Sequence, residues 1–520
     1  MRIKSATLQP DKDKDSIHLL ILLTIALCIG VYLISTTVLI ARDGTAFIEY
    51  AKKLASDAIA AMVSEYQHPG YPFLILMAHR MAKIASGSSS IWGWIYSAQF
   101  MALAFRLLTI AVLYFVGKEI VGPRLSFLAI LILILLPKPA GYGSDALSDW
   151  PYLFFLSSGF LLLIRGALYE RWWQFGFAGL AAGLGYLVRP ECAQLVVFGS
   201  LWTALQLWGA KCVITRGKAA LMVVLLLVGF LVPAGPYMKL TGAIFPKKDI
   251  GQFRFSILDS RFLSSIEYRA SSIEYRESSF APKNMAKAFD ELIEEIGDTL
   301  MWFFGPALLL GAYEYFRQPA YPEACPSGRR DWYKPQKFFT AALIALNVPL
   351  MIWLFCKYGY ISGRHILPLV VLTIFFVPSG LRVLGNWLSA IFSKTRLENN
   401  QDLNLWFFIL LIGGSALCVP KLLTPLHADK RSYREAARWL TEYTDKKDII
   451  AVPDTRISFY AQRKGLKWTE GQIPEQARYA VKIFEEDNKP TEPGQLGKVE
   501  YRYVDKKNEK VSIVIYRKLP

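Results

Sequence analysis

The sequence predicts an all-α polytopic membrane protein with a transmembrane bundle of about 11 helices and a small C-terminal extracytoplasmic α/β domain. Of its 520 residues, 53% are hydrophobic and 14% are aromatic, a composition that is unusual for a soluble chain of this length. Apolar runs of roughly 17 to 25 residues, which cross about 30 Å of hydrocarbon, recur as far as residue 420. Beyond that point apolar runs are short and charged residues are frequent.

Hydropathy gives the position of each span. The predicted spans are residues 17–41, 92–116, 125–137, 150–164, 174–188, 191–208, 219–238, 298–315, 338–356, 366–381 and 404–420. The first run is too long for a signal-peptide core and has no small-residue cleavage pattern behind it, so we interpret it as a retained span.

The distribution of basic residues predicts the orientation of the bundle. The formal net charge is +17, and lysine and arginine are commoner in the short segments that lie inside if the N-terminus is cytoplasmic. Arg329, Arg330, Lys334 and Lys337 form one such cluster. We therefore expect a cytoplasmic N-terminus and an extracytoplasmic C-terminal domain.

Two domains follow, a transmembrane domain over residues 1–420 with long outer loops at 42–91 and 239–297, and a soluble α/β domain over residues 421–520. Amphipathic patterns at 45–61 and 73–84 indicate helices on the membrane surface. The second loop contains a tandem duplication within 264–276, which we interpret as a repeated helical turn. The tail predicts helices at 432–443, 456–463 and 474–487, a strand at 449–452 and a hairpin over 498–516.

Several function classes receive no support. No basic run or nucleic-acid-binding motif accompanies the positive charge, so we expect no nucleic-acid partner. The six cysteines lie in or beside apolar runs without metal-type spacing, and we expect neither disulfides nor a cysteine-bound metal. We predict no cofactor and no metal-ligand residues, although a divalent metal remains an open alternative.

Charged residues gather at the predicted outer ends of the spans, where burying a charge is costly unless it is paired or used. They are Arg42, Asp43, Asp145, Asp149, Arg189, Glu191, Lys357, Arg364 and His365. A carboxylate can deprotonate an acceptor hydroxyl while guanidinium groups stabilise a leaving phosphate. This inventory suits glycosyl transfer from a phosphate-linked lipid. A nucleotide-sugar enzyme would need a cytoplasmic nucleotide-binding fold, for which the inner segments are too short.

Four motifs carry a family resemblance. They are Ala41-Arg-Asp-Gly-Thr-Ala-Phe-Ile-Glu-Tyr-Ala51, His68-Pro-Gly-Tyr-Pro72, the Gly-rich span that ends in Leu187-Val-Arg-Pro-Glu191, and Tyr360-Ile-Ser-Gly-Arg-His-Ile-Leu-Pro368. In content and order they resemble the signatures of the GT-C integral-membrane glycosyltransferases, which include protein O-mannosyltransferases and lipid A aminoarabinose transferases. The tail segments 433–440 and 456–461 are similar to the outer domains of bacterial members.

The resemblance implies a GT-C-like bundle and a role for each motif residue. Asp43 would be the catalytic base, Asp145 or Asp149 the second acidic residue, and Arg189 and Arg364 contacts of the lipid phosphate. Further candidates for binding phosphate or sugar are Arg42, His68, Lys239, Lys357 and His365. Gly44 departs from the family, which often has Glu at this position, and Gln67-His68 replaces an acidic-basic pair of some members.

The resulting hypothesis is an enzyme of the bacterial inner membrane that moves a sugar from a polyprenyl-phosphate-linked donor to an acceptor hydroxyl, with inversion at the anomeric carbon. The acceptor could be a lipid, a glycan or a protein, and membrane lipids surround the bundle. The alternatives are a transporter or lipid flippase, and a non-catalytic envelope scaffold. Structural interpretations also stay open, because Asp149 could cap its helix and Arg189 could reach lipid head groups.

Overall fold

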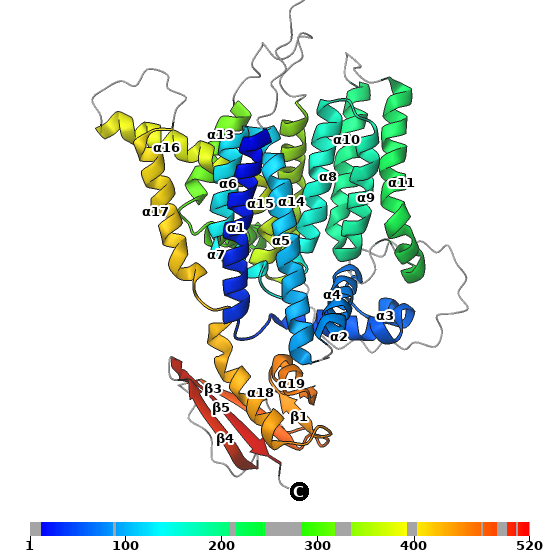
Figure 1. The fold of residues 1–520 in the computed structure, drawn as a ribbon, viewed down its shortest axis with the longest axis vertical. Helices are drawn as coiled ribbons and strands as arrows, with labels where there is room; N and C mark the ends of the chain where they lie inside the picture. Colours follow the sequence, from blue (N-terminus) through cyan, green and yellow to red (C-terminus); the bar gives the residue numbers. More distant parts are fainter. Residues whose placement is uncertain are drawn as a thin grey trace, which may run out of the picture.

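The computed structural model describes residues 12–86, 90–208, 215–242, 244, 282–317, 334–392, 403–469, 472–485, 497–505 and 508–518. Long helices run side by side in a bundle, and a small sheet with two helices lies beyond one end of it (Figure 1). The duplication at 264–276 and the pair Arg329 and Arg330 lie outside the described residues.

Helices make up most of the described chain. In sequence order they are α1 (Lys12–Thr36), α2 (Arg42–Ser56), α3 (Ala58–Ser64), α4 (Gly70–Ser86), α5 (Ile91–Val121), α6 (Pro123–Leu135), α7 (Pro137–Tyr142), α8 (Asp149–Leu168), α9 (Trp173–Val188), η1 (Pro190–Ala193), α10 (Gln194–Trp208), α11 (Arg216–Thr241), α12 (Pro282–Thr299), α13 (Gly305–Arg317), α14 (Pro335–Tyr358), α15 (Gly363–Thr373), α16 (Phe376–Phe392), α17 (Leu405–Leu422), η4 (Ala428–Lys430), α18 (Arg431–Tyr443) and α19 (Thr455–Ala461).

Each of the eleven predicted spans overlaps at least one helix, and the chain is a multi-pass membrane protein. Among the described helices, α1, α5, α8, α11, α14 and α17 are long and apolar enough to cross a membrane, and α15 with α16 makes a seventh span if the bent pair counts as one. The other predicted spans coincide with the shorter helices α6, α9, α10 and α13.

Two of the predicted spans were wrong in shape. The run at 366–381 is a broken helix, because α15 and α16 meet at an angle of 68°. Pro378 lies in the first turn of α16, where a missing N–H is tolerated, so a new helix begins there. Within the run at 298–315, α12 ends at Thr299 and α13 begins only at Gly305. Hydropathy reports the apolar composition of a segment and does not show where the helix axis bends or breaks.

Glycines let α9 and α11 approach each other with their backbones almost in contact. A Cβ added at Gly179 would collide with the carbonyl of Leu226, and one at Gly183 with the carbonyl of Phe230. Small residues at such spacing are typical of tightly packed transmembrane helices. The glycine-rich span of the sequence is therefore a helix–helix contact surface.

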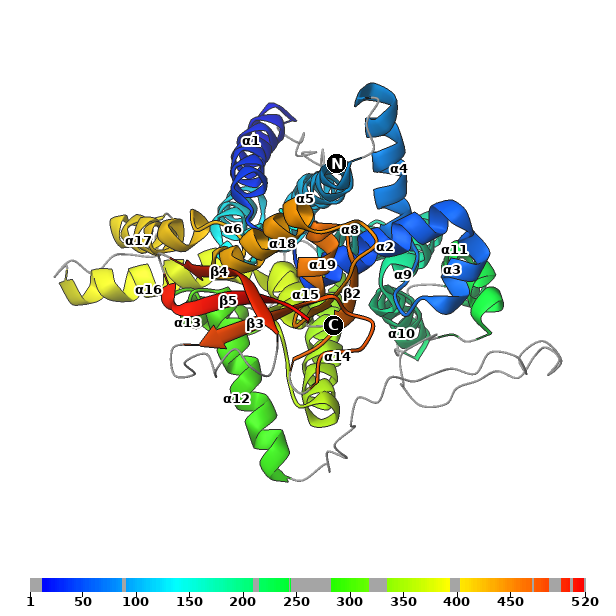
Figure 2. The same ribbon diagram turned by 90° about the horizontal axis from the view of Figure 1, so that it is seen from below.

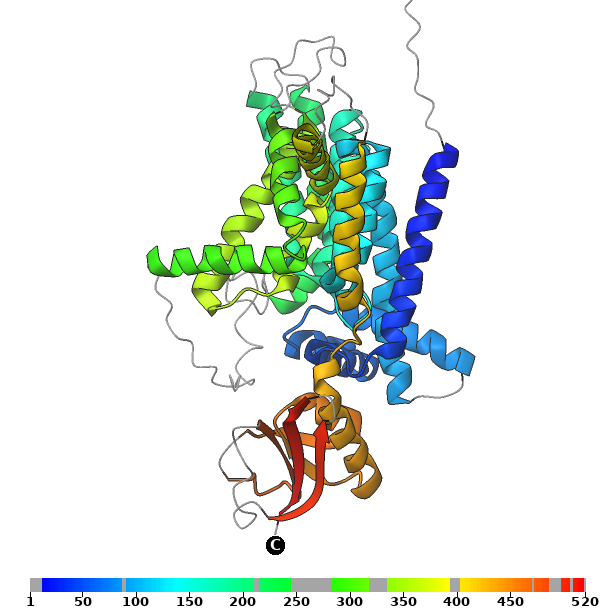
Figure 3. The same cartoon turned by 90° about the vertical axis from the view of Figure 1, so that its left-hand side faces the viewer.

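The segment after α1 forms three short helices at the end of the bundle that faces the sheet (Figure 1). The predicted amphipathic helices are present as α2, α3 and α4, and α2 buries Phe47, Ile48, Tyr50 and Leu54 against the bundle. α12, in the second long loop, was not predicted. It projects outward, roughly perpendicular to the bundle (Figures 2 and 3).

The C-terminal part contains a five-stranded mixed sheet. Its strands are β1 (Ile449–Val452), β2 (Lys464–Lys467), β3 (Tyr479–Glu485), β4 (Lys498–Asp505) and β5 (Asn508–Arg517), in the order β2-β1-β3-β5-β4. β1 is parallel to β2 and β3, whereas β5 is antiparallel to β3 and β4. Ile513 and Ile515 of β5 face one core and Val514 and Tyr516 the other, as expected from the two-residue period of a strand.

The sequence predicted α18, α19, β1 and the β4–β5 hairpin at nearly their observed positions. The helix predicted at 474–487 was wrong, since residues 479–485 form β3. The Tyr-Ala-Val-Lys-Ile-Phe segment carries apolar residues on both faces, and pairing with β1 and β5 decides its structure.

Candidate active site

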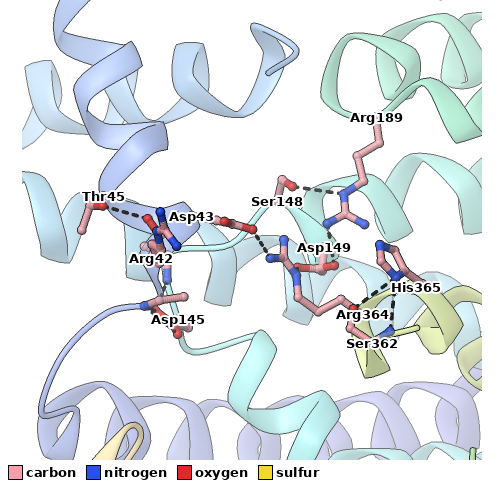
Figure 4. A network of polar contacts seen from close by, with 12 residues as sticks. Arg42, Asp43, Thr45, Asp145, Ser148, Asp149, Arg189, Ser362, Arg364 and His365 are labelled. Carbon is pink, nitrogen blue, oxygen red and sulfur yellow. Dashed lines mark hydrogen bonds and ion pairs between the residues drawn. The ribbon is translucent and has the colours of Figure 1, made fainter. Parts of the chain in front are cut away.

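Side chains from four distant segments meet in one group (Figure 4). The group includes the start of α2, at the end of the bundle that faces the sheet (Figure 1). Asp43 lies in the first turn of α2 and Asp149 at the start of α8. Arg189 follows α9, and Arg364 lies in the first turn of α15. We call these four residues the carboxylate–arginine cluster. These four charged residues, which the sequence predicted at the outer ends of different spans, thus come together.

Asp149 is the buried centre of the cluster. Its residue is only 1% exposed, and its Oδ2 accepts a hydrogen bond of 2.9 Å from Nε of Arg364. Its Oδ1 lies 2.9 Å from Nη2 of Arg189. Two guanidinium groups therefore compensate the cost of burying this carboxylate.

Asp43 is the exposed member. Arg364 also donates a hydrogen bond from Nη1 to Oδ2 of Asp43, so one guanidinium bridges the two carboxylates. The side chain of Asp43 is 51% exposed, whereas that of Asp149 is 2% exposed. Asp43 is consequently the carboxylate that an incoming hydroxyl group can reach.

The local backbone explains the position of Arg189. Because Pro190 follows it, Arg189 leaves the helical region and adopts an extended conformation, with φ −149° and ψ 131°. Its Nε donates to Oγ of Ser148 at 3.2 Å, and its guanidinium lies 5.7 Å from the centre of the Tyr152 ring. The side chain therefore turns toward the start of α8.

Asp145 does not join the cluster, although only four positions separate it from Asp149. Its carboxylate accepts hydrogen bonds from the backbone N–H groups of Ala41 and Ala146, and it lies 2.9 Å from Nε2 of His427. The structure thus gives the two acidic candidates different surroundings.

The remaining predicted residues contact other groups. His68 is buried between the rings of Tyr186 and Tyr237, with ring centres 5.2 and 5.3 Å away. His365 accepts from the Ser362 backbone N–H at Nδ1 and completes a capping box at the start of α15. It therefore stabilises the helix that carries Arg364.

Three basic candidates lie at helix ends. The ammonium of Lys357 lies 5.3 Å from the ring centres of both Trp353 and Tyr358. Lys239 is exposed in the last turn of α11. Arg42 is exposed at the start of α2, and its charge acts on Asp454 of the C-terminal part.

Two tyrosines near the cluster were missed by the sequence reasoning. Burial, reinforced by the charges of Asp149 and Glu295, raises the pKa of Tyr142 to about 12. Burial, together with the charges of Asp145 and Asp149, raises the pKa of Tyr71, whose hydroxyl donates to the Ala98 carbonyl. Both are therefore protonated hydroxyls at neutral pH. Nothing in their sequence context distinguishes them from core aromatic residues.

No group of three or more His, Cys, Asp or Glu residues in the described ranges could hold a metal ion.

A cavity of about 670 Å³ lies between α2, the start of α5 and α19, where Glu49, Trp94 and Phe459 are among its lining residues. The four cluster residues do not line it. The arrangement offers a half-exposed carboxylate beside two guanidinium groups.

Residues 67–235 match the model of the dolichyl-phosphate-mannose-protein mannosyltransferase family. The match includes Asp145, Asp149 and Arg189, while Asp43 and Arg364 lie outside it. The chain also has the fold of two solved integral-membrane glycosyltransferases of the GT-C type. The family match covers 169 of the 520 residues, and the two structures, at 12 and 13% identity, show a shared fold.

The first of these structures is ArnT from Cupriavidus metallidurans bound to undecaprenyl phosphate. It has a TM-score of 0.57 and 13% identity, over 95% of this chain and 97% of that chain. The second is the archaeal oligosaccharyltransferase AglB from Archaeoglobus fulgidus, in complex with an inhibitory peptide and a dolichol-phosphate. Its TM-score is 0.54 at 12% identity, over 91% of this chain and 69% of that chain. No curated protein sequence matches this chain.

Proposed function

We propose that this protein is a GT-C glycosyltransferase that transfers a sugar from a polyprenyl-phosphate carrier to an acceptor hydroxyl at the outer face of a bacterial inner membrane. The observation that carries the proposal is the Arg364 bridge, which connects an exposed carboxylate, Asp43, to a buried carboxylate, Asp149, held by a second arginine. Undecaprenyl phosphate bound to ArnT and dolichol-phosphate bound to AglB support a polyprenyl-phosphate donor.

The proposed reaction is a direct displacement. Asp43 takes the proton of the acceptor hydroxyl as its oxygen forms a bond to the anomeric carbon, and the bond from that carbon to the phosphate oxygen breaks. The phosphate gains one negative charge as it leaves. Arg189 and Arg364 stabilise this charge, because guanidinium groups form strong paired hydrogen bonds with phosphate. Attack opposite the leaving group inverts the anomeric carbon.

The arrangement of the cluster suits this order of events. Arg364 is shared between two carboxylates before the phosphate charge develops, so its guanidinium is already oriented by Asp149. A group held in place before the reaction needs no reorganisation in the transition state. Asp43, at 51% exposure, can release the captured proton to water afterwards.

The distribution of basic side chains supports an outer location for the site. Basic residues end α8 and α13 and begin α11, at the end of the bundle opposite the sheet (Figure 1). They are Arg165, Arg317, Arg216 and Lys218. Under the positive-inside rule this asymmetry supports a cytoplasmic location for that end, and with it an outer location for the carboxylate–arginine cluster and the sheet.

The test begins with mass spectrometry of envelope lipids and glycans from cells with and without the gene, which identifies the transferred sugar and its acceptor. Transfer is then measured in vitro with that donor for Asp43→Asn. We expect turnover to fall by about 100-fold or more, because the base is removed while its shape is kept.

Asp57→Asn is the matched control. Asp57 lies in the same outer segment, where its Oδ1 caps α3 by accepting from the Ala60 N–H, a role that asparagine also fills. Turnover of this control should equal that of the wild type. Equal turnover in Asp43→Asn would contradict the role of Asp43 as the base. Envelope glycans that stay unchanged without the gene would contradict the proposed transferase activity.

A further inference from the structure

The linker formed by residues 37–41 connects α1 to α2 and presents Asp43. Its backbone is held by the C-terminal part of the chain. The Val38 N–H donates to the Leu426 carbonyl at 3.1 Å, and Arg434 donates to the Val38 carbonyl at 2.7 Å. The Ile40 N–H donates to the hydroxyl of Tyr460 at 3.0 Å. The segment before the proposed base is therefore fixed by residues about 400 positions further along the chain. A linker that only joined two helices would not need these contacts.

Asp145 holds the last residue of this linker. Its two oxygens lie 3.0 and 3.1 Å from the Ala41 N–H nitrogen, and Oδ1 also accepts from Ala146 at 2.7 Å. Nε2 of His427 lies 2.9 Å from Oδ2. With the residue 3% exposed and three donors around its carboxylate, Asp145 is occupied by structural contacts.

His427 is itself held in an uncommon conformation. Its φ of 53° lies in the left-handed region, which residues other than glycine adopt at a cost. His427 precedes η4 and α18, so its contact with Asp145 joins the start of the C-terminal domain to the loop before α8. The strained backbone places the imidazole where Asp145 can accept from it.

The same loop also supports Asp43 from its other side. Gly44 lies so close to Ala146 that an added Cβ would be 2.8 Å from the Ala146 Cβ and 2.9 Å from its carbonyl oxygen. The loop residues Asp145 and Ala146 thus contact both Ala41 and Gly44. Asp43 lies between these two anchored positions.

We propose that Asp145 and His427 are positioning residues, and that the C-terminal domain clamps the linker that presents Asp43 to the substrate. This inference rests on the proposed function of Asp43. The Asp43 side chain is half-exposed and hydrogen-bonded to Arg364, so its place also depends on where the linker holds the backbone of α2. A base displaced by about 1 Å loses a large part of its rate advantage. The C-terminal domain is then part of the catalytic apparatus.

Hydrogen–deuterium exchange on the full-length protein in detergent tests the clamp without any substrate. In His427→Ala the amides of residues 38–41 should exchange at least about tenfold faster than in the wild type, because their acceptors move away. His427→Gln, whose amide can replace the Nε2 donor, should restore slow exchange. Amides of α18 and of the sheet should stay at wild-type rates in both variants, which separates loss of the clamp from unfolding.

Activity supplies a second readout. With the donor identified from the envelope, His427→Ala should lower kcat about tenfold and leave the donor KM within about twofold, since Arg189 and Arg364 keep their places. Binding of undecaprenyl phosphate should be unchanged. Arg478→Ala is the control, because its ion pair with Asp448 lies in the same domain and does not contact the linker.

The outcomes distinguish this inference from the proposed function. Wild-type exchange at residues 38–41 in His427→Ala, or equal loss in His427→Ala and His427→Gln, overturns the clamp. A loss that appears in donor KM instead of kcat also overturns it. Wild-type turnover of Asp43→Asn would instead overturn the proposed function, and the exchange data would then still decide whether the clamp exists.

Discussion

Arg364 donates a hydrogen bond to Asp43, although 321 positions separate the two residues in the sequence. The pairing joins the first turn of α2 to the first turn of the half-helix α15. The positive end of the α15 dipole and the Arg364 charge therefore lie together at the place where a leaving phosphate would gain charge.

Replacing Asp149 should affect both arginines at once. In Asp149→Asn two guanidinium groups lose their buried counter-charge, and removing one partner of such a pair costs about 3 to 5 kcal/mol. We expect a lower Tm in detergent and weaker binding of undecaprenyl phosphate, because both arginines lose the carboxylate that orients them together. Wild-type Tm together with wild-type binding would contradict this role of Asp149.

The shape of the Arg364 side chain should matter as well as its charge. Arg364→Lys keeps the positive charge but cannot bridge two carboxylates with a planar group. Turnover should fall by about tenfold or more, and further in Arg364→Ala. Arg438→Ala, which removes a 70% exposed side chain from α18, should leave turnover unchanged. If lysine sustained full turnover, the bridging geometry would be unimportant.

Gly44 should tolerate no side chain. In Gly44→Ala the new Cβ meets Ala146 at 2.8 Å, so α2 must shift and Asp43 moves with it. We expect kcat to fall with a smaller change in donor KM. Gly235→Ala on α11 is the control, since nothing lies within 4 Å of its added Cβ and alanine favours a helix. Equal kcat in the two variants would show that α2 can adjust.

Acid should loosen the C-terminal domain at Asp454. Burial alone would raise the pKa of Asp454, yet hydrogen bonds from the Arg456 side chain and backbone N–H lower it below its usual 3.8. A carboxyl group with a depressed folded-state pKa stabilises the fold above pH 3.8, and this stability is lost as pH falls toward the folded-state pKa. The protection factors of the amides of residues 449–461, measured down to pH 3, should fall less steeply in Asp454→Asn than in the wild type. An equal response in Asp454→Asn and in the wild type would show that the Asp454 carboxylate does not cause the acid effect.

Much of the fold could be predicted because its signals are local. A 24-residue apolar run such as 13–36 must cross the membrane or be buried, and α18 shows its amphipathic period directly. The break between α15 and α16 and the strand β3 could not be read in this way. They depend on packing against elements that lie far away in the sequence.

The site could be predicted in part. Motif resemblance selected Asp43, Arg189 and Arg364, and the structure brings them together around Asp149. Sequence could not separate Asp145 from Asp149, since both precede the same helix. Only the path of the loop shows that one faces Arg364 and the other faces Ala41 and His427. Tyr460 and Arg434 gave no signal of their contact with the linker.

The backbone contact between α9 and α11 has a consequence for the depth of the reaction in the bilayer. Where Gly179 and Gly183 rest on carbonyl groups of α11, the two helices cannot slide past each other as ordinary side-chain-covered helices can. α9 is short, and Arg189 is its first residue past the end. The two glycines therefore fix the position of α9 along α11, and with it the depth of the Arg189 guanidinium in the membrane. A methyl group added at either glycine would change that depth.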